Sequence, residues 1–533
     1  MKPTSPFLLL SIFAVLVFLI FGTVRSTASG PSGLRQVTAP APAVPTTVPE
    51  LRRVAAEQDR GRRSTKAPGS KYRLCLKKKE TRTAAQQKID SQLLYAIKMR
   101  RGERITNNVQ SLSVEVGADD AGLVTVDIAA IVDDQLLNDL RGMGVKVSNV
   151  FRKYNSLRAV VSLEQLETIA GFSQVRFIQP KQEALLSQTR VESRRLLQPQ
   201  PRYPGPGAQQ TWKPYEDFNE RAARVRAALQ PVLSSAPAPN SPLGIGSVTS
   251  QGDTTHGAFI ARGTFNVNGT GIKIGVLSDG VSSLAVSQST GDLGPVTVLP
   301  GQGGFGDEGT AMLEIIHDLA PGAQLYFATA ISGLPSFAQN IRDLRTAGCD
   351  IILDDVGYFV ESPFQDGQTP TVVSPNNSGL ATQAVNDVVA SGALYFSSAA
   401  NSGNLNDGTS GTWEGDFADG GTISLVPGGK VHDFDPTASV SQFDTITESG
   451  FLTNLHWSDP LGASNNDYDL FIITDTGTDV IGSSTNIQTG TQDPYEAIFF
   501  APVGYRVVIL QKTGAANRFL HLATNRGELT LCH

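Results

Sequence analysis

The sequence predicts an α/β domain built on a parallel sheet, with a small α+β unit before it and an all-β domain after it. In the middle of the chain, short apolar runs alternate with segments of helical periodicity. That alternation is typical of a parallel sheet with helices on both faces. Residues 109–187 have the order β-α-β-β-α-β of a ferredoxin-like unit. Residues 413–530 hold short strand-like runs between Gly, Asn, Asp and Pro turns, as in a β-sandwich.

Residues 1–29 have the composition of a secretory signal peptide. Lys2 precedes the apolar run Phe7–Val24, and the small residues Ser26–Ala28 suit a cleavage site. We therefore expect a secreted protein, extracellular or periplasmic, with no membrane contact after cleavage. A retained N-terminal membrane anchor is the alternative, because an 18-residue apolar run is at the lower limit for a membrane span.

Charge is spread unevenly along the chain. Residues 30–107 are rich in Pro and Ala and then basic, which predicts a disordered leader. Residues 51–104 hold 17 Lys and Arg against 5 Asp and Glu, whereas the whole chain has a net charge of −6. The body is therefore acidic, which argues against nucleic acid as a partner. Three cysteines, Cys75, Cys349 and Cys532, are too few to build the scaffold on disulfides, and their odd number leaves a free thiol.

The α+β unit is assigned to residues 108–187. Its expected strands and helices alternate in the order given above: Leu123–Val132, Asp133–Met143, Val145–Phe151, Ser156–Ser162, Leu163–Gly171 and Gln174–Ile178. Residues 188–242 are a Pro-rich linker containing Arg194-Arg195. Exposed polar linkers of this kind are where proteolytic processing takes place.

The α/β domain is assigned to residues 243–412. Ile272–Leu277 reads as a buried strand, and Asp279 follows it at the carboxyl end, where open α/β sheets place their ligands. The Gly-rich loop GQGGFGDEG then leads to a helix over Thr310–Leu319, with Glu308 just before it. Further strands and helices alternate after it: Gln324–Ala330, Leu334–Ala347, Asp350–Gly357, Gly379–Ser391 and a strand from Leu394 that ends in a polar turn.

These motifs resemble those of the subtilisin-like serine peptidases. In that family, a strand ending in the catalytic aspartate is followed by a His-Gly-Thr helix and an Ala-Pro-x-Ala-x-Leu-Tyr strand. Asp279 matches the aspartate, and Ala320–Tyr326 matches the second strand. Glu308–Thr310 stands in place of His-Gly-Thr, so the resemblance implies a glutamate base, as in the related sedolisins, which work in acid. It covers roughly residues 255–405; a doubly wound domain of another kind is the alternative.

The resemblance implies two further site residues. The family's strand that corresponds to Asp350–Gly357 lines the specificity pocket, with a serine where Asp355 stands. The family's Ala-Ala-Gly-Asn turn, whose asparagine donates to the oxyanion, corresponds to the turn at Asn401. Two carboxylates buried near one site repel each other's ionisation, so we expect a raised pKa for one of them. A surface turn holding Asp354 and Asp355 is the alternative.

The resemblance fails at the nucleophile. The family carries it in Gly-Thr-Ser-x-Ala/Ser-x-Pro at a helix start, well after the asparagine turn. Here Gly408–Ser410 is followed by no helical pattern and no Pro. We interpret Ser410 as a turn serine, with a nucleophile as the alternative. His256 precedes the Asp279 strand, and we interpret it as a surface histidine, not a substitute base.

Residues 413–533 are assigned to the β-sandwich. Its expected strands lie between turn residues: Thr422–Val426, Ser439–Ile446, Leu452–Trp457, Asp469–Ile473, Ala497–Phe500, Tyr505–Leu510 and Phe519–Ala523. One turn gathers side-chain oxygens of the kind that bind calcium: Asp459, Asn465, Asn466, Asp467 and Asp469. Their spacing fits no strict calcium-loop signature, so ordinary turn chemistry and a calcium site both stay open.

The sequence thus predicts a secreted subtilisin/sedolisin-like serine endopeptidase chain, with an incomplete parallel sheet. Its partners would be a polypeptide substrate and its own α+β unit, which resembles the inhibitory propeptides that precede the catalytic domain in this family; a generic α/β sandwich without that role is the alternative. Asp279 would orient and stabilise charge, Glu308 would be the general base and Asn401 the oxyanion donor, with Asp355 beside them. The segment with the nucleophilic serine is missing, so we expect an inactive chain. The alternatives are a non-catalytic secreted binding protein on a peptidase-like scaffold, and a gene fragment.

Overall fold

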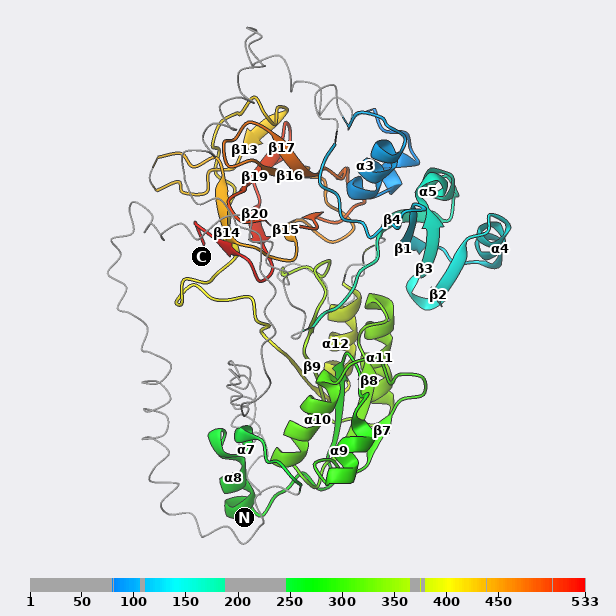
Figure 1. Cartoon of the computed structure of the whole chain (residues 1–533), viewed down its shortest axis with the longest axis vertical. Helices are drawn as coiled ribbons and strands as arrows, with labels where there is room; N and C mark the ends of the chain where they lie inside the picture. Colours follow the sequence, from blue (N-terminus) through cyan, green and yellow to red (C-terminus); the bar gives the residue numbers. More distant parts are fainter. Residues whose placement is uncertain are drawn as a thin grey trace, which may run out of the picture.

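The computed structural model describes three folded parts of the chain (Figure 1). The described residues are Lys79, 81–105, 111–186, 246–364, Ser374, 379–437, 439–500 and 502–532. The predicted signal peptide, most of the basic leader and the whole of the linker lie outside them. In these described ranges, no helix has the length and apolar character needed to cross a membrane.

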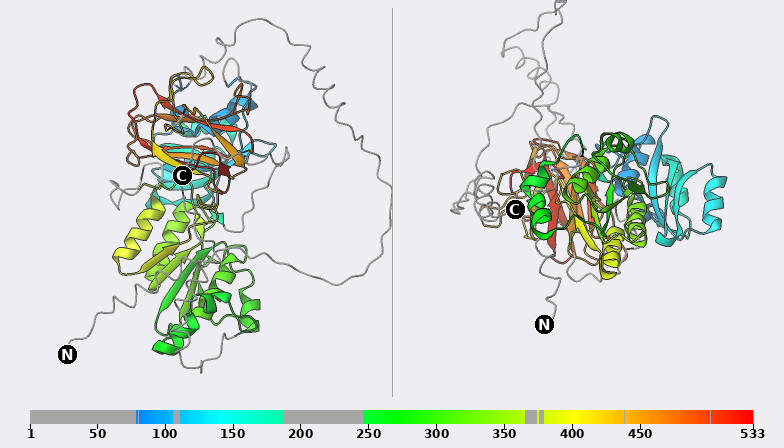
Figure 2. Two further views of the ribbon diagram at one scale, coloured as in Figure 1. Left: turned by 90° about the vertical axis from the view of Figure 1, so that its left-hand side faces the viewer. Right: turned by 90° about the horizontal axis from the view of Figure 1, so that it is seen from below.

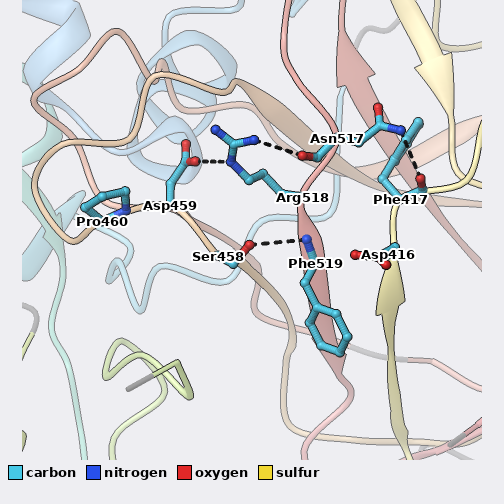
Figure 3. Close-up of a pocket in the computed structure, with 8 residues that line it drawn as sticks. All are labelled: Asp416, Phe417, Ser458, Asp459, Pro460, Asn517, Arg518 and Phe519. Carbon is cyan, nitrogen blue, oxygen red and sulfur yellow. Dashed lines mark hydrogen bonds and ion pairs between the residues drawn. The ribbon is translucent and has the colours of Figure 1, made fainter. Parts of the chain in front are cut away.

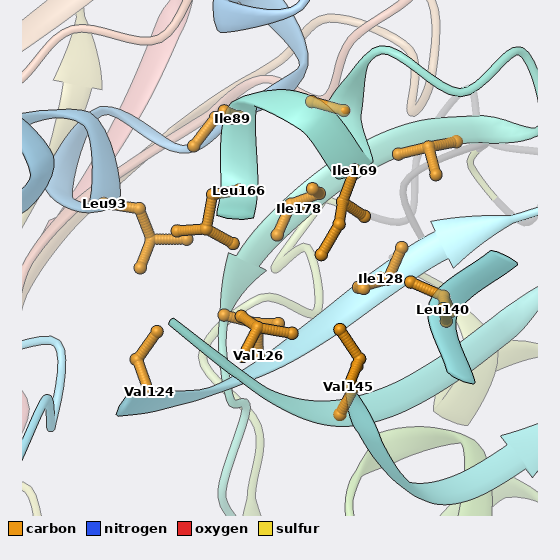
Figure 4. Packing of buried hydrophobic residues seen from close by; sticks show 14 of the residues in the cluster. Ile89, Leu93, Val124, Val126, Ile128, Leu140, Val145, Leu166, Ile169 and Ile178 are labelled. Carbon is orange, nitrogen blue, oxygen red and sulfur yellow. The ribbon is translucent and has the colours of Figure 1, made fainter. Parts of the chain in front are cut away.

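The α+β unit (residues 111–186) is a four-stranded antiparallel sheet with two helices on one face. Its elements are β1 (Leu123–Ala130), α4 (Asp134–Gly142), β2 (Lys146–Phe151), β3 (Ser156–Ser162), α5 (Leu166–Ala170) and β4 (Val175–Pro180), with one-turn helices at Arg152–Tyr154 and Leu163–Gln165. The strand order is β2-β3-β1-β4. Apolar side chains from the strands and both helices form one core, drawn in Figure 4. Helix α4 begins where the Asp133 side chain accepts a hydrogen bond from the Leu136 amide.

Residues 81–105 are folded, so the prediction of a disordered leader is wrong for this part. They hold a short helix, η3 (Gln86–Lys88), and α3 (Ser91–Arg100). Helix α3 buries Leu93 and Ile97 in the core of the α+β unit and Tyr95 against the all-β domain. Lys79 is buried between two carboxylates of that domain. These carboxylates, Asp467 and Asp469, lie almost 400 residues further along the chain, so the composition of the leader does not reveal them.

The α/β domain (residues 246–411) is built on a parallel sheet, as expected. Its elements are α7 (Gln251–Thr255), α8 (Ala258–Phe265), β6 (Lys273–Ser278), α9 (Leu284–Thr290), β7 (Val296–Val298), α10 (Glu308–Leu319), β8 (Gln324–Thr329), α11 (Leu334–Thr346), β9 (Ile351–Asp354), β10 (Val356–Gly357), α12 (Leu380–Ala390) and β11 (Leu394–Ser397). The strand order is β11-β9-β6-β8-β7, and every neighbouring pair is parallel. Neither α9 nor β7 was expected from the sequence, because both are short and only partly buried.

The order of the strands places a switch point between β6 and β9. Helices α11 and α12 pack on one face of the sheet, and α9 and α10 pack on the other. The chain leaves β6 toward β7 on one side and leaves β9 toward β11 on the other side. In open α/β sheets, ligands bind at the carboxyl ends of the strands at such a point. The residues that follow β6 and β9 are Asp279 and Asp355.

The all-β domain (residues 412–532) contains two antiparallel sheets that share one core. Its strands are β12 (Thr412–Asp416), β13 (Gly429–Val431), β14 (Asp444–Glu448), β15 (Thr453–Trp457), β16 (Tyr468–Ile473), β17 (Val480–Ser484), β18 (Tyr495–Ile498), β19 (Arg506–Lys512), β20 (Phe519–Ala523) and β21 (Glu528–Leu529). One sheet has the order β12-β20-β15-β18 and the other β17-β16-β19-β14-β21, with β13 on β19. Trp413, Trp457 and Tyr468 are buried between them.

The predicted strand Thr422–Val426 is wrong. Leu425 and Val426 are buried, but they lie in a loop that packs on the outer face of the second sheet, near Tyr95. Burial without strand pairing produces the same apolar signal as a strand, so the sequence pattern did not separate the two.

The three parts touch one another (Figure 2). Tyr154 of the α+β unit donates to Gln339 Oε1 of α11 at 2.6 Å. His456 Nε2 of the all-β domain lies 3.0 Å from the Phe359 carbonyl oxygen, just after β10. The carboxyl edge of the parallel sheet therefore faces the all-β domain.

Candidate functional site

Asp279 is held in a fixed position by main-chain amides. It follows β6 and is 4% exposed. Its Oδ1 atom accepts hydrogen bonds from the Gly280 amide at 2.5 Å and from the Gly309 amide at 3.1 Å. The second donor is near the start of α10, so the carboxylate lies at the N-terminus of that helix. Asp279 thus joins the end of β6 to the start of α10.

Glu308 is brought next to Asp279 by the same contact. It is the first residue of α10, and Gly309, which donates to Asp279, follows it directly. Glu308 is 5% exposed, and both of its carboxylate oxygens are shielded from solvent. A side chain at Gly309 would approach Phe327 of β8 to 2.4 Å, so this glycine lets the helix start pack closely on the sheet. The expected pairing of Asp279 with the Glu308 segment is present.

We expect Gly306→Ala to destabilise the domain more than Gly301→Ala. Both glycines have positive φ in the same loop, which costs an alanine about 1–2 kcal/mol. At Gly301 the added Cβ meets nothing within 4 Å, whereas at Gly306 it would lie 1.9 Å from Asp279 Oδ2. Overlap adds about 1–3 kcal/mol. Urea unfolding followed by circular dichroism measures both; equal losses would contradict this packing around Asp279.

Asp354 is the last residue of β9, Asp355 follows it, and both are buried. Asp354 accepts hydrogen bonds from the Tyr395 hydroxyl at 2.6 Å and the Ser397 hydroxyl at 2.9 Å. Burial raises the pKa of Asp354 to about 6, despite these two donors. Asp355 is 4% exposed, and its Oδ2 atom accepts no hydrogen bond from the described residues. The two acids are therefore not in a surface turn, and the raised pKa belongs to Asp354.

The last segment of the α+β unit lies across this edge. Strand β5 (Leu185–Leu186) pairs antiparallel with β10, with Leu186 opposite Val356 and Leu185 opposite Gly357. Upstream, the Gln182 amide donates to Asp127 of β1 at 2.7 Å, which ties the segment to its own unit. A peptide in extended conformation therefore occupies the position directly after Asp355.

Arg526, which the sequence reasoning missed, reaches the same place from the all-β domain. It lies in the turn between β20 and β21, and its Nη2 atom donates to the Leu186 carbonyl oxygen at 2.6 Å. Burial lowers the pKa of Arg526, while the carboxylates of Asp355 and Glu308 act in the opposite direction. The one local signal is Asn525-Arg526-Gly527, a hairpin-turn sequence, and it gives no indication of what the arginine contacts.

No hydrogen bond among the described residues connects Asn401 with Asp279, Glu308 or Asp355. It is exposed, in a turn that follows β11 and contains Ala400 with φ of 61°. Strand β9 separates β11 from β6 in the sheet. The segments of Asp279, Glu308 and Asp355 thus lie at one edge of the sheet, whereas Asn401 follows a strand that is two positions away from β6.

Ser410 lies in a turn, and His256 lies at the end of a short helix. Ser410 is 5% exposed, and its hydroxyl oxygen accepts a hydrogen bond from the Thr412 amide at 3.2 Å. Its carbonyl oxygen accepts from the Leu529 amide at 3.1 Å, which ties this end of the α/β domain to β21 of the all-β domain. His256 directly follows α7, and α7 packs on α10. Gly252 of α7 lies next to Leu319 in the last turn of α10, so this contact is at the other end of α10 from Glu308.

The oxygen-rich turn of the all-β domain has protein cations as partners. Lys79 Nζ lies 2.6 Å from both Asp467 Oδ1 and Asp469 Oδ1; these carboxylates outweigh the effect of burial and raise the pKa of Lys79. Arg518 Nε lies 2.5 Å from Asp459 Oδ1, beside the hollow of about 670 Å³ drawn in Figure 3. Within the part of the chain that the structure describes, no three His, Cys, Asp or Glu side chains are arranged to hold a metal ion.

Neither a known sequence family nor a curated protein matches this chain. Among solved structures, it is similar to the epidermin leader peptide processing serine protease of Staphylococcus aureus, with 8% identity, a TM-score of 0.25, and coverage of 52% of this chain and 59% of that one. It is also similar to fervidolysin of Fervidobacterium pennivorans, a keratinolytic enzyme related to subtilisin, with 13% identity, a TM-score of 0.27, and coverage of 55% and 41%. The chain thus spans about two fifths to three fifths of these proteins. Because these TM-scores are low, the function is proposed from the residues of the site alone.

Proposed function

We propose that this chain is a peptidase-type scaffold of the subtilisin/sedolisin group, with a cleft that binds polypeptide in an extended conformation. The observation that carries this proposal is the antiparallel pairing of β5 with β10, directly after Asp355 and beside the Asp279–Glu308 pair. Main-chain pairing to an exposed strand is a general way to bind peptides of varied sequence. In this chain, the occupant is its own segment 181–186.

The α+β unit would then act as a propeptide that fills the cleft with its own tail. Asp279 would orient and stabilise charge, Glu308 would accept a proton, and Asn401 would keep the donor role that the family resemblance implies. Export follows from the composition of residues 1–29. We do not propose hydrolysis by the 533 residues themselves, because Ser410 lies in a turn that is hydrogen-bonded to β21 of the all-β domain. That observation favours the second candidate, a polypeptide-binding protein without catalysis.

A variant with a disrupted tail tests the cleft. Leu185→Asp/Leu186→Asp places two charges beside buried carboxylates, which should expel β5 from its place on β10. We expect a fluorescent peptide with the sequence of residues 181–186 to bind this variant at least about tenfold more tightly than wild type. In wild type, the tethered tail competes at an effective concentration of about millimolar. Fluorescence anisotropy measures the binding.

The control is Leu405→Asp, the same change at an exposed leucine of the α/β domain. It should bind the peptide as weakly as wild type. A tail variant that also fails to bind would show that the cleft does not take polypeptide, and the proposed function would be wrong.

A further inference from the structure

The all-β domain places one cation at the acidic edge of the parallel sheet. Arg526 belongs to a turn that lies 340 residues after Leu186, yet its guanidinium holds the Leu186 carbonyl oxygen. Leu186 pairs with Val356, the residue that follows Asp355. One hydrogen bond and one pair of strands thus connect Arg526, the tail and the acidic group.

The turn that carries Arg526 is held rigidly. Asn525 and Arg526 both have positive φ, 49° and 70°. The Asn525 side-chain amide donates to the Leu452 carbonyl oxygen at 3.0 Å and to Asn454 Oδ1 at 2.6 Å. A side chain at Gly450 would lie 1.7 Å from the Thr524 carbonyl oxygen, so the neighbouring loop packs closely on the turn. The position of the guanidinium is therefore set by the fold of the all-β domain.

Arg526 also supplies positive charge at the edge of the sheet where Glu308 and Asp355 are buried. Glu308 and Asp355 are each about 5% exposed or less, and burying carboxylates without a cation is costly. The ring of Phe451 lies 5.6 Å from the guanidinium carbon, within the range of a cation–π contact, and limits how far the side chain moves. A guanidinium donates in several directions, so one group can bind a carbonyl and still face carboxylates.

We propose that the all-β domain completes the polypeptide-binding cleft, and that Arg526 is the residue that binds the main chain of the bound segment. The guanidinium donates to a carbonyl oxygen of the extended peptide and balances the charge of Glu308 and Asp355. It contacts the main chain, so the ligand class is an extended polypeptide regardless of its side chains at that position. The inference rests on the proposed function, because it assigns a residue to the same cleft.

Hydrogen exchange of the full chain tests this role. Arg526→Met removes a charge-assisted hydrogen bond, so we expect amides of 185–186 and 356–357 to exchange about 10- to 100-fold faster than in wild type. Exchange in β16 and β19, in the core of the same domain, should not change. Arg518→Met is the matched control, since Arg518 pairs with Asp459 in that domain and should leave the tail protected.

The outcomes separate this proposal from the proposed function. If Arg526→Met leaves the tail protected while Leu185→Asp/Leu186→Asp exposes it, the cleft binds the tail without Arg526 and the present inference is wrong. If neither variant changes exchange at 185–186, the tail is not bound and both proposals fail. If Arg526→Met also loosens β16 and β19, the milder Arg526→Gln decides: faster exchange confined to 185–186 and 356–357 supports the role, and wild-type exchange there overturns it.

Discussion

The purified 533-residue protein should leave casein intact from pH 3 to pH 8 and should not react with fluorophosphonates. Glu308 can act as a base only if a hydroxyl lies within hydrogen-bond reach, and the chain's single Gly-Thr-Ser is at 408–410. The Ser410 hydroxyl is engaged in a turn with Thr412. Loss of the nucleophile costs subtilisin about 10⁶-fold in kcat, so the expected rate is at the level of the blank.

The alternative that Ser410 is the nucleophile makes the opposite forecast. Wild type would then cleave casein, and Ser410→Ala would abolish cleavage while leaving the circular dichroism spectrum unchanged. Casein hydrolysis by both proteins decides between the two. Activity that disappears with Ser410 would refute our interpretation of this residue, whereas equal inactivity agrees with the cleft being a binding site.

The second large effect concerns His456, where the all-β domain meets the α/β domain. Burial, with a smaller contribution from His521, lowers the pKa of His456 to about 3, although the Phe359 carbonyl opposes this. In the unfolded chain the pKa is near 6.5, so below that pH the unfolded state binds a proton that the folded state does not. Each pH unit from about 6.5 down to 3 therefore removes about 1.4 kcal/mol of the free energy of unfolding.

We accordingly expect the effect of His456→Gln on stability to change sign with pH. At pH 7 the variant should be less stable than wild type by about 1 kcal/mol, because it disturbs the bond to Phe359. Between pH 7 and pH 4.5 it should gain about 2–3 kcal/mol relative to wild type, because glutamine has no proton to bind, so at pH 4.5 it should be the more stable protein by about 1–2 kcal/mol. Urea unfolding followed by tryptophan fluorescence measures this, since Trp413 and Trp457 lie in the core of the all-β domain.

His432→Gln is a useful comparison in the core of the same domain. Burial also lowers the pKa of His432 to about 3, and its Nδ1 atom accepts a hydrogen bond from the Ala418 amide at 3.1 Å. The same slope with pH is expected, although the hydrogen-bond partner of His432 lies within the all-β domain. Parallel curves for wild type and either variant between pH 7 and 4.5 would contradict the neutral, buried state of that histidine.

The local pattern of apolar residues was enough to predict most helices and strands of the α/β domain and the α+β unit. A helix or strand that buries one face must repeat apolar residues at its own period, so α10, α11 and β6 are visible in the sequence. The rule that ligands lie at the carboxyl ends of strands also predicted a site at Asp279, and the family resemblance added Asp355 to it. The pattern failed where burial comes without regular structure, as at Leu425 and Val426, and where elements are short, as in β7.

The sequence by itself thus determined the class of fold, the carboxylates at the sheet edge and the absence of a second Gly-Thr-Ser. Only the tertiary structure decided what fills that edge and what balances its charge. The β5–β10 pair, the Arg526 contact with Leu186 and the burial of Lys79 join residues from separate parts of the chain. A hydrogen bond or an ion pair needs one donor and one acceptor at any separation, so it leaves no periodic trace in the sequence. Such contacts appear only once the chain has folded.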